Sequence, residues 1–347
     1  SMKRDRPDTR VVCLDNLHRR GSELNLERLR TAGISFVHGD IRCREDLEAV
    51  GAFDLLLECS AEPSVLSGYR GSPEYLIQTN LVGTVNCLEA CRKQGAAILF
   101  LSTSRVYPME AIRRLTYRET DFRLELGGNI GVPGVSEEGF SEAFPLEGAR
   151  SLYGATKLCS EILIQEYVDA YGLQAVINRC GVITGPWQMG KVDQGFVVLW
   201  MARHLWGGEL SYIGFGGKGK QVRDILHVED LYDLVAYQLD HMEDLSGSVF
   251  NVGGGPDRSI SLLELTGMCR RLTGNEISIQ SQAQDRAADI PYYVSDCRKV
   301  REATGWRPKR DLERILADTL AWLRENEKDL RPLLGPEAAS NGGGEAG

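Results

Sequence analysis

The chain has 347 residues, of which 42% are hydrophobic and 26% charged, and its formal net charge is −9. This length is enough for one large domain or two modest ones with hydrophobic cores. Acidic and basic residues are interleaved, so the surface repels a phosphodiester backbone and nucleic-acid binding is not expected. No apolar run approaches the eighteen residues of a membrane helix, and residues 1–8 lack the apolar stretch of a signal peptide. We therefore expect a cytoplasmic protein with neither membrane nor nucleic-acid partners.

The predicted elements alternate between short, continuously apolar strands and helices. Strands are predicted at 11–14, 34–37, 53–57, 96–101 and 174–178, and helices at 24–30, 46–50, 76–93 and 155–171. Such alternation is typical of a parallel sheet covered by helices on both faces. We therefore expect an α/β fold with a Rossmann-like, doubly wound parallel sheet and a smaller second α/β domain.

The domain boundaries follow from where this alternation stops. We expect a first domain over 1–180 and a second mainly over 181–330, with 222–252 returning to the first. Residues 108–150 are rich in Gly, Glu and Pro, which predicts an irregular insertion that forms a flap over a site. The Gly-rich tail, 335–347, is predicted to be disordered.

The nine cysteines do not indicate a metal site. They are scattered and lack CxxC spacing, and although Cys87 and Cys91 lie four apart, no histidine or second cysteine pair accompanies them. We expect reduced thiols that pack as small apolar side chains, and no bound metal.

Tyr153 and Lys157 form a Tyr-x-x-x-Lys pattern at the start of the predicted helix 155–171. Residues four apart share one helical face, and a lysine ammonium beside a phenol lowers its pKa, so that it can accept a hydroxyl proton near neutral pH. Thr103 follows the apolar strand 96–101, at the sheet edge where α/β folds bind ligands. The three residues are candidate catalytic groups; the structural alternative is that Thr103 only caps a turn and Tyr153 only packs.

This set resembles the Ser/Thr–Tyr–Lys triad of the extended short-chain dehydrogenase/reductase family, and the resemblance covers roughly residues 8 to 325. It implies an NAD-binding first domain and a nucleotide-sugar-binding second domain. Asp15 matches the family acid that holds the adenosine ribose, Asp40 the aspartate beside the adenine, and Asn80 the asparagine beneath the site. Taken singly, these could be solvent-facing carboxylates and a helix amide. The implied NAD-binding residues are Asp15, Asn16, Asp40, Ile41, Ser60, Ala61, Asn80, Tyr153 and Lys157.

Within this family, several segments resemble the CDP-paratose (CDP-tyvelose) 2-epimerases: 15–21, 36–42, 151–154, 193–196 and 217–227. Residues 59–65 depart from the usual pattern. The resemblance implies a CDP-linked sugar inverted at C2, and a homodimer formed through helices 76–93 and 155–171. It also implies that Gln194 binds substrate and that Arg223 and Arg286 clamp the diphosphate, a role that suits the planar arginine fork.

Two other readings of the function stay open. One is a 4-epimerase or 4,6-dehydratase of another nucleotide sugar, although Ser104 and Arg105 stand where a dehydratase of this family usually has an acidic pair. The other is a truncated, catalytically inactive homologue that binds nucleotide sugars.

The family's first strand and its Gly-rich phosphate loop are expected to be absent, because only fourteen residues precede Asp15. Residues 214–219 fit the G-x-G-x-x-G pattern of such a loop. The residues after them are strand-like rather than helical, so we expect a hairpin turn there and not a phosphate loop.

Overall fold

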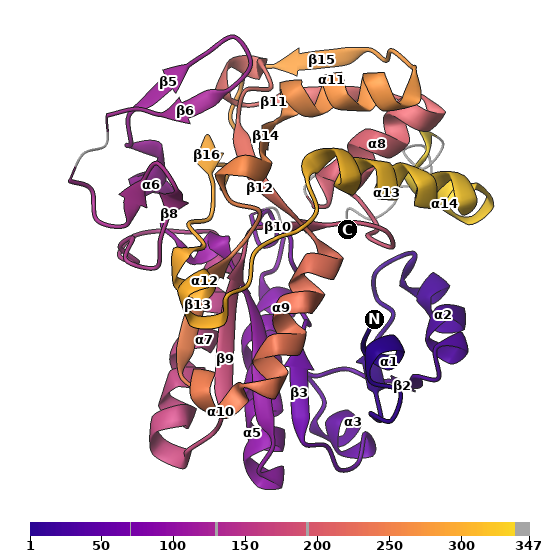
Figure 1. Cartoon of the computed structure of the whole chain (residues 1–347), viewed down its shortest axis with the longest axis vertical. Helices are drawn as coiled ribbons and strands as arrows, with labels where there is room; N and C mark the ends of the chain where they lie inside the picture. Colours follow the sequence, from indigo (N-terminus) through magenta and orange to yellow (C-terminus); the bar gives the residue numbers. More distant parts are fainter. Residues whose placement is uncertain (70, 129–130, 192–193, 337–347) are drawn as a thin grey trace.

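The computed structural model describes residues 1–69, 71–128, 131–191 and 194–336, so most of the predicted disordered tail lies outside the described residues. The molecule has two lobes (Figure 1): a larger lobe built on a parallel sheet, and a smaller lobe above the carboxyl ends of its strands. The described residues contain no helix long and apolar enough to cross a membrane.

The larger lobe contains four parallel strands in the order β13-β9-β4-β3, and the predicted α/β class is confirmed. The strands are β3 (Leu55–Glu58), β4 (Ala97–Thr103), β9 (Ala175–Cys180) and β13 (Ser248–Val252). Their side chains point alternately to two apolar layers, which is why these strands are apolar throughout.

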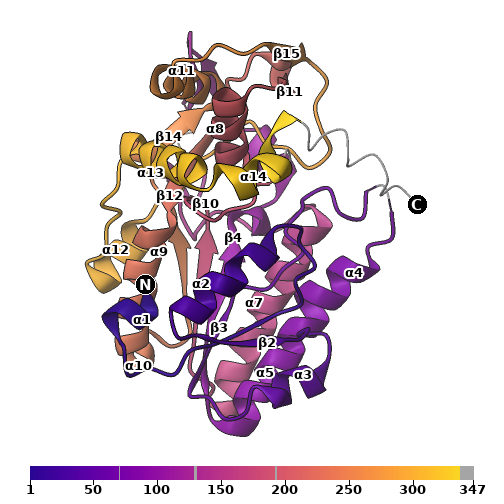
Figure 2. The same cartoon turned by 90° about the vertical axis from the view of Figure 1, so that its right-hand side faces the viewer.

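Helices cover both faces of this sheet. One face packs against α5 (Gly83–Gln94) and α7 (Leu152–Tyr171), which lie side by side in Figure 2. The other packs against α9 (Val228–Asp240), α10 (Met242–Leu245) and α12 (Arg298–Thr304). The helix predicted over 76–93 is in fact α4 (Glu74–Ile77), a π turn (Gln78–Val82) and α5.

The two N-terminal strands form a separate ladder. β1 (Val12–Asp15) pairs in parallel with β2 (Ser35–His38), flanked by α2 (Asn25–Thr31) and followed by α3 (Arg44–Ala49). Among the described residues, β1 bonds only to β2, and β3 bonds only to β4. No ladder therefore joins this pair to the main sheet in the part of the chain described.

The smaller lobe contains two further ladders. β12 (Val222–His227) pairs with β10 (Val182–Thr184), β14 (Ser259–Ser261) and β16 (Tyr292–Tyr293), while β11 (Leu210–Ile213) pairs with β15 (Ile279–Gln282). These ladders pack against helices α8 (Phe196–Trp206), α11 (Leu262–Thr273), α13 (Leu312–Glu325) and α14 (Glu327–Leu334).

Two sequence-based expectations about this lobe need correction. Of 222–252, β12 stays in the smaller lobe because its hydrogen-bonded neighbours are there, and only α9 and β13 return to the main sheet. Residues 215–217 form a 3₁₀ turn between β11 and β12, which pair with different strands, so the turn is not a hairpin. The turn leads into a strand, as expected, and not into a helix.

The insertion 108–150 is more regular than predicted. It contains α6 (Met109–Arg113), the pair β5 (Tyr117–Glu119) and β6 (Leu124–Leu126), and the pair β7 (Val135–Ser136) and β8 (Gly139–Phe140). Phe140 stacks on Tyr293 of β16 with 5.2 Å between ring centroids, within an apolar cluster of its own. The insertion is thus anchored by packing.

Candidate active site

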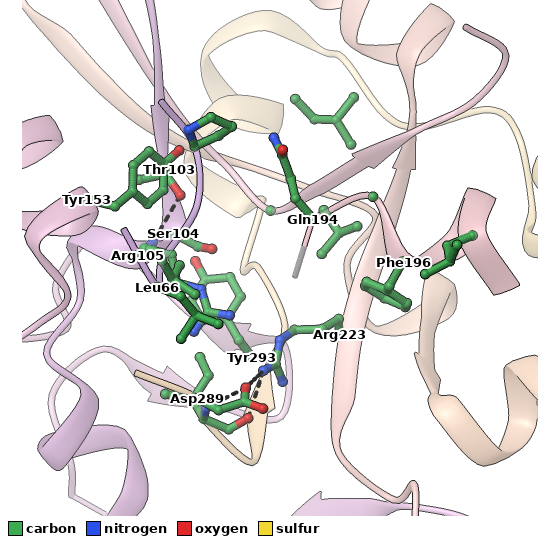
Figure 3. Close-up of a pocket in the computed structure, with 18 of the residues that line it drawn as sticks. Leu66, Thr103, Ser104, Arg105, Tyr153, Gln194, Phe196, Arg223, Asp289 and Tyr293 are labelled. Carbon is green, nitrogen blue, oxygen red and sulfur yellow. Dashed lines mark hydrogen bonds and ion pairs between the residues drawn. The ribbon is translucent and has the colours of Figure 1, made fainter. Parts of the chain in front are cut away.

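A cavity of about 500 Å³ lies where the two lobes meet, at the carboxyl ends of β4 and β9. Of the predicted site residues, it brings together Ala61, Thr103, Tyr153, Lys157, Gln194, Arg223 and Arg286 (Figure 3). It does not include Asp15, Asn16, Asp40, Ile41, Ser60 or Asn80. None of the described residues of 108–150 lines it, so the predicted flap over this site is wrong: the insertion packs instead on β16.

Thr103 is both a turn cap and a cavity residue. It is the last residue of β4, and its Oγ1 accepts a hydrogen bond of 3.1 Å from the backbone N–H of Arg105. This bond closes the 3₁₀ turn Ser104–Val106. The hydroxyl also interacts with the phenol of Tyr153, so capping fixes the hydroxyl in the cavity rather than excluding it from catalysis.

The start of α7 places Tyr153 beside Thr103. Ser151 caps the helix by accepting a 3.1 Å bond from the N–H of Gly154, which starts the helix three residues earlier than predicted. Gly154 packs directly against the 3₁₀ turn, because a Cβ at this position would lie 2.1 Å from the carbonyl oxygen of Arg105. Only glycine permits this approach.

The expected lowering of the Tyr153 pKa by Lys157 is not what the structure shows. Burial raises the pKa of Tyr153 to about 12, opposed by the hydroxyl of Thr103 and the charge of Arg105. The Lys157 ammonium lies 3.9 Å from the centre of the Phe100 ring, as a cation–π contact. Lys157 is nonetheless buried at the cavity wall, where a ligand can reach it.

Glu58 is a buried acid that the sequence analysis missed. It ends β3, is 2% exposed, and accepts a 2.8 Å bond from the hydroxyl of Thr84. Burial raises the pKa of Glu58, and the charge of Lys157 opposes that shift. Conversely, burial lowers the pKa of Lys157, and Glu58 is the main group that raises it. An acid at the end of a strand predicted to be wholly apolar was the available signal.

Asn80 supports the site from beneath. It lies fully buried in the π turn before α5, a type of irregularity that is frequent at functional sites. Its Oδ1 accepts from the N–H of Glu62 at 2.7 Å, and its Nδ2 donates to the carbonyl of Glu62 at 3.0 Å and to Thr156 at 3.3 Å. Asn80 therefore fixes the loop after β3 to α7 and does not reach the cavity.

A second group of predicted residues lies at the carboxyl ends of β1 and β2. Asn16 donates a 2.8 Å bond to Asp40, and Asp15 accepts a 2.7 Å bond from the N–H of Leu17. Bonds from Arg42 hold the pKa of Asp40 at about 2. Asp15 is exposed at its strand end, a position from which its carboxylate can accept from a ribose diol.

The other two predicted NAD-binding residues of this region are differently placed. Ile41 is 7% exposed and packs on Gly83 of α5, where a Cβ would lie 2.5 Å from the Ile41 side chain. Ser60 is half-buried in the loop after β3. These positions fit a dinucleotide whose adenosine lies over β1 and β2 and whose nicotinamide reaches Tyr153 and Lys157.

Three arginines approach the cavity from different elements. Arg223 of β12 donates to the carboxylate of Asp289 at 3.0 Å and to the carbonyl of Ile290 at 2.7 Å. Burial, followed by the charge of Arg105, lowers the pKa of Arg223 to about 10, while Asp289 raises it. Arg286 lines the same cavity. The concentration of positive charge fits an anionic ligand group such as a diphosphate.

Gln194 connects the cavity to the N-terminal segment. Its side-chain oxygen accepts from Arg19, which also donates to the backbone carbonyl of Met189. Arg19 therefore bonds the segment after β1 to the smaller lobe, a contact that the sequence gave no signal for. No group of three or more His, Cys, Asp or Glu residues in the described part of the chain could hold a metal ion.

The model of the NAD dependent epimerase/dehydratase family matches residues 3–253. The chain belongs to this family. It is 29% identical over 311 residues to the CDP-paratose 2-epimerase of Salmonella typhi, with 86% of this chain and 87% of the relative covered. Its cofactor is NAD, as in the family and in its structural neighbours.

Two solved structures illustrate the breadth of chemistry on this fold. The dTDP-glucose 4,6-dehydratase DesIV of Streptomyces venezuelae, with NAD and TYD bound, superimposes with a TM-score of 0.75 at 27% identity, covering 95% of this chain and 92% of that one. The UDP-glucose 4-epimerase of Thermotoga maritima, with UDP-glucose, gives a TM-score of 0.72 at 25% identity and covers 94% of each chain.

Proposed function

We propose that the protein is an NAD-dependent epimerase of a nucleotide sugar, and that it converts CDP-paratose to CDP-tyvelose by inversion at C2. The observation that carries the proposal is one cavity that holds both the Thr103–Tyr153–Lys157 set and a group of arginines. The first can act on a sugar hydroxyl and the second on a diphosphate. The likeness to the Salmonella typhi 2-epimerase supports the choice of carbon and of CDP.

The chain's residues divide the work as follows. The phenolate of Tyr153 accepts the proton of the sugar hydroxyl, and the Thr103 hydroxyl hydrogen-bonds the same oxygen. NAD, when bound, takes the hydride from the carbon and later returns it. Tyr153 gives its proton back as the hydride returns to the opposite face of the ketone, so atoms and electrons balance over the cycle. Lys157 is placed to bind the nicotinamide ribose.

The smaller lobe holds the rest of the substrate. Arg223 and Arg286 bind the diphosphate, and Gln194 contacts the sugar-nucleotide at the point where the lobes meet. In the ligand-free protein, Asp289 is the counterion of Arg223. A diphosphate that approaches Arg223 therefore replaces or joins a carboxylate already in place, which keeps the buried guanidinium neutralised.

The two other functions are less well supported. Elimination of water needs a group that can give a proton to the leaving hydroxyl, yet the residues that follow Thr103 are Ser104 and Arg105, and neither is an acid at neutral pH. An inactive binding protein has no need of the close approach between Gly154 and Arg105 that fixes Tyr153 beside Thr103.

The test is direct. The purified protein with NAD is incubated in turn with CDP-, UDP-, GDP- and dTDP-linked sugars, and the ring protons are followed by NMR. We expect inversion at C2 of a CDP-linked dideoxyhexose. Inversion at C4 supports the 4-epimerase, and a new 4-keto-6-deoxy product supports the dehydratase.

We also propose a homodimer formed through α5 and α7. Both helices carry large apolar side chains in exposed positions: Val82 just before α5, and Leu152, Ile162 and Tyr171 on α7. Apolar exposure of this kind on adjacent helices is typical of an interface. Light scattering at micromolar concentration tests this, and a monomer contradicts it.

A further inference from the structure

Arg105 touches both halves of the proton-transfer pair through its backbone. Its N–H donates to the hydroxyl of Thr103 at 3.1 Å, and its carbonyl lies against Gly154, the residue after Tyr153. The side chain lines the cavity, and its Nη1 donates to the carbonyl of Ala288 at 3.2 Å. Ala288 has a positive φ of 59°, unusual for a residue with a side chain. Arg105 therefore joins the catalytic turn to the loop 286–290.

The groups that face the Tyr153 phenol come from four elements. They are Thr103 of β4, Cys180 of β9, Arg105 of the 3₁₀ turn and Glu62 of the loop after β3. Among these four, Arg105 carries the positive charge and Glu62 the opposing negative one. Lys157, on the same helix as Tyr153, is coupled to Glu58 and lies over Phe100.

The charge on Arg105 is only partly neutralised. The nearby carboxylate is that of Asp289, which is bonded to Arg223 at 3.0 Å and to the N–H of Ile290 at 2.9 Å. Arg113 also faces Arg105, from α6, and carries the same charge. Positive charge therefore remains at the guanidinium, in a buried place where charges interact strongly.

We propose that Arg105 is a positioning residue of the acid–base step: its guanidinium supports the Tyr153 phenolate, and its bond to Ala288 sets where that charge lies. This inference rests on the proposed function, in which Tyr153 is the base. An arginine stays protonated throughout, so it cannot give a proton to a leaving hydroxyl. The oxidised sugar at this site recovers its hydride rather than losing water.

The experiment compares Arg105→Gln and Arg105→Lys in the NAD-loaded protein. Tyrosinate absorbance is titrated without substrate, and the same titration in the Tyr153→Phe background is subtracted to isolate Tyr153. The pH profile of kcat/KM is measured in parallel. We expect the Gln variant to move the Tyr153 midpoint and the acid limb upward by about 1–3 pH units. Turnover at pH 7 then falls about tenfold for each unit, and the Lys variant restores most of the loss.

Arg113→Gln is the matched control. Arg113 donates to the carbonyl of Asp289 at 2.9 and 2.6 Å, so it contacts the same loop from outside the cavity. We expect its titration and pH profile to match those of the unaltered protein. An equal shift in this variant would mean that the loop, not the charge, is responsible, and would overturn the inference.

The failure of this inference is distinguishable from that of the proposed function. If the protein epimerises a nucleotide sugar but Arg105→Gln leaves the tyrosinate midpoint unchanged, the role of Arg105 is wrong. If the midpoint moves as expected while no nucleotide sugar is converted, the coupling of Arg105 to Tyr153 is supported and the proposed function is wrong.

Discussion

The carbonyl oxygen of Arg105 lies where a side chain at Gly154 would have to begin, 2.1 Å from the ideal Cβ position. This close approach connects the end of β4 to the start of α7. The distance between the hydroxyl of Thr103 and the phenol of Tyr153 is therefore set by a backbone contact.

We expect Gly154→Ala to lower turnover at least about tenfold and to destabilise the fold by roughly 1–3 kcal/mol, because the turn or the helix must move. Thermal unfolding and initial rates measure both effects. Gly267→Ala is the matched control: it lies inside α11 with open space around its Cβ position, so it should be neutral or slightly stabilising. Equal behaviour of the two variants would contradict the packing argument.

We expect Tyr153→Phe to reduce turnover by at least about a hundredfold, the usual effect of losing a positioned acid–base group. Only a hydroxyl is removed, so the far-UV circular dichroism and the melting temperature should change little. Rates within a few-fold of the unaltered protein would show that Tyr153 is not the base.

We expect Arg223→Ala to weaken nucleotide-sugar binding by roughly 1.5–3 kcal/mol, the contribution of a charge-assisted hydrogen bond. Affinity for NAD should not change, because Arg223 belongs to β12 of the smaller lobe. Isothermal titration with each ligand distinguishes the cases. A parallel loss of affinity for both ligands would place Arg223 in the cofactor half of the cavity.

Asp40 gives a pH-dependent stability prediction. Bonds from Arg42 lower its pKa to about 2 in the folded protein, against about 3.9 in an unfolded chain. A lowered pKa stabilises the fold above the unfolded value, and that contribution is lost as the pH falls from about 4 to 2. Asp40→Asn should therefore cost about 1–2 kcal/mol at pH 7 and progressively less below pH 4, as measured by urea unfolding. A cost that does not change with pH would mean that the carboxylate charge contributes little.

The sequence predicted best what depends on local pattern. The strands ending at Asp15 and Thr103 and the helix bearing Lys157 could be found because apolar runs and helical spacing are local properties. Three-dimensional contacts could not be found this way. The orientation of Lys157 toward Phe100 and Glu58 depends on strands that are distant in sequence, so its expected effect on Tyr153 was wrong.

The same limit explains the two errors in domain organisation. The composition of the insertion 108–150 suggested an irregular flap, but its few aromatic residues, Phe140 foremost, find partners on β16 that no local pattern could indicate. Likewise, β12 reads as an apolar strand that either sheet could accept, and its actual neighbours decide the outcome.

The separate ladder of β1 and β2 has a consequence for how the protein opens. No backbone ladder connects this pair to β3 in the described residues, so what holds it is side-chain contact, including the bonds of Arg19 to Gln194 and Met189. A unit attached in this way can detach without breaking the hydrogen bonds of the main sheet. Amide hydrogen exchange should therefore show two populations, with the amides of β1 and β2 exchanging through a low-energy subglobal opening and those of β4 and β9 only through global unfolding. NAD, which spans both groups of residues, would merge the two populations into one cooperative unit.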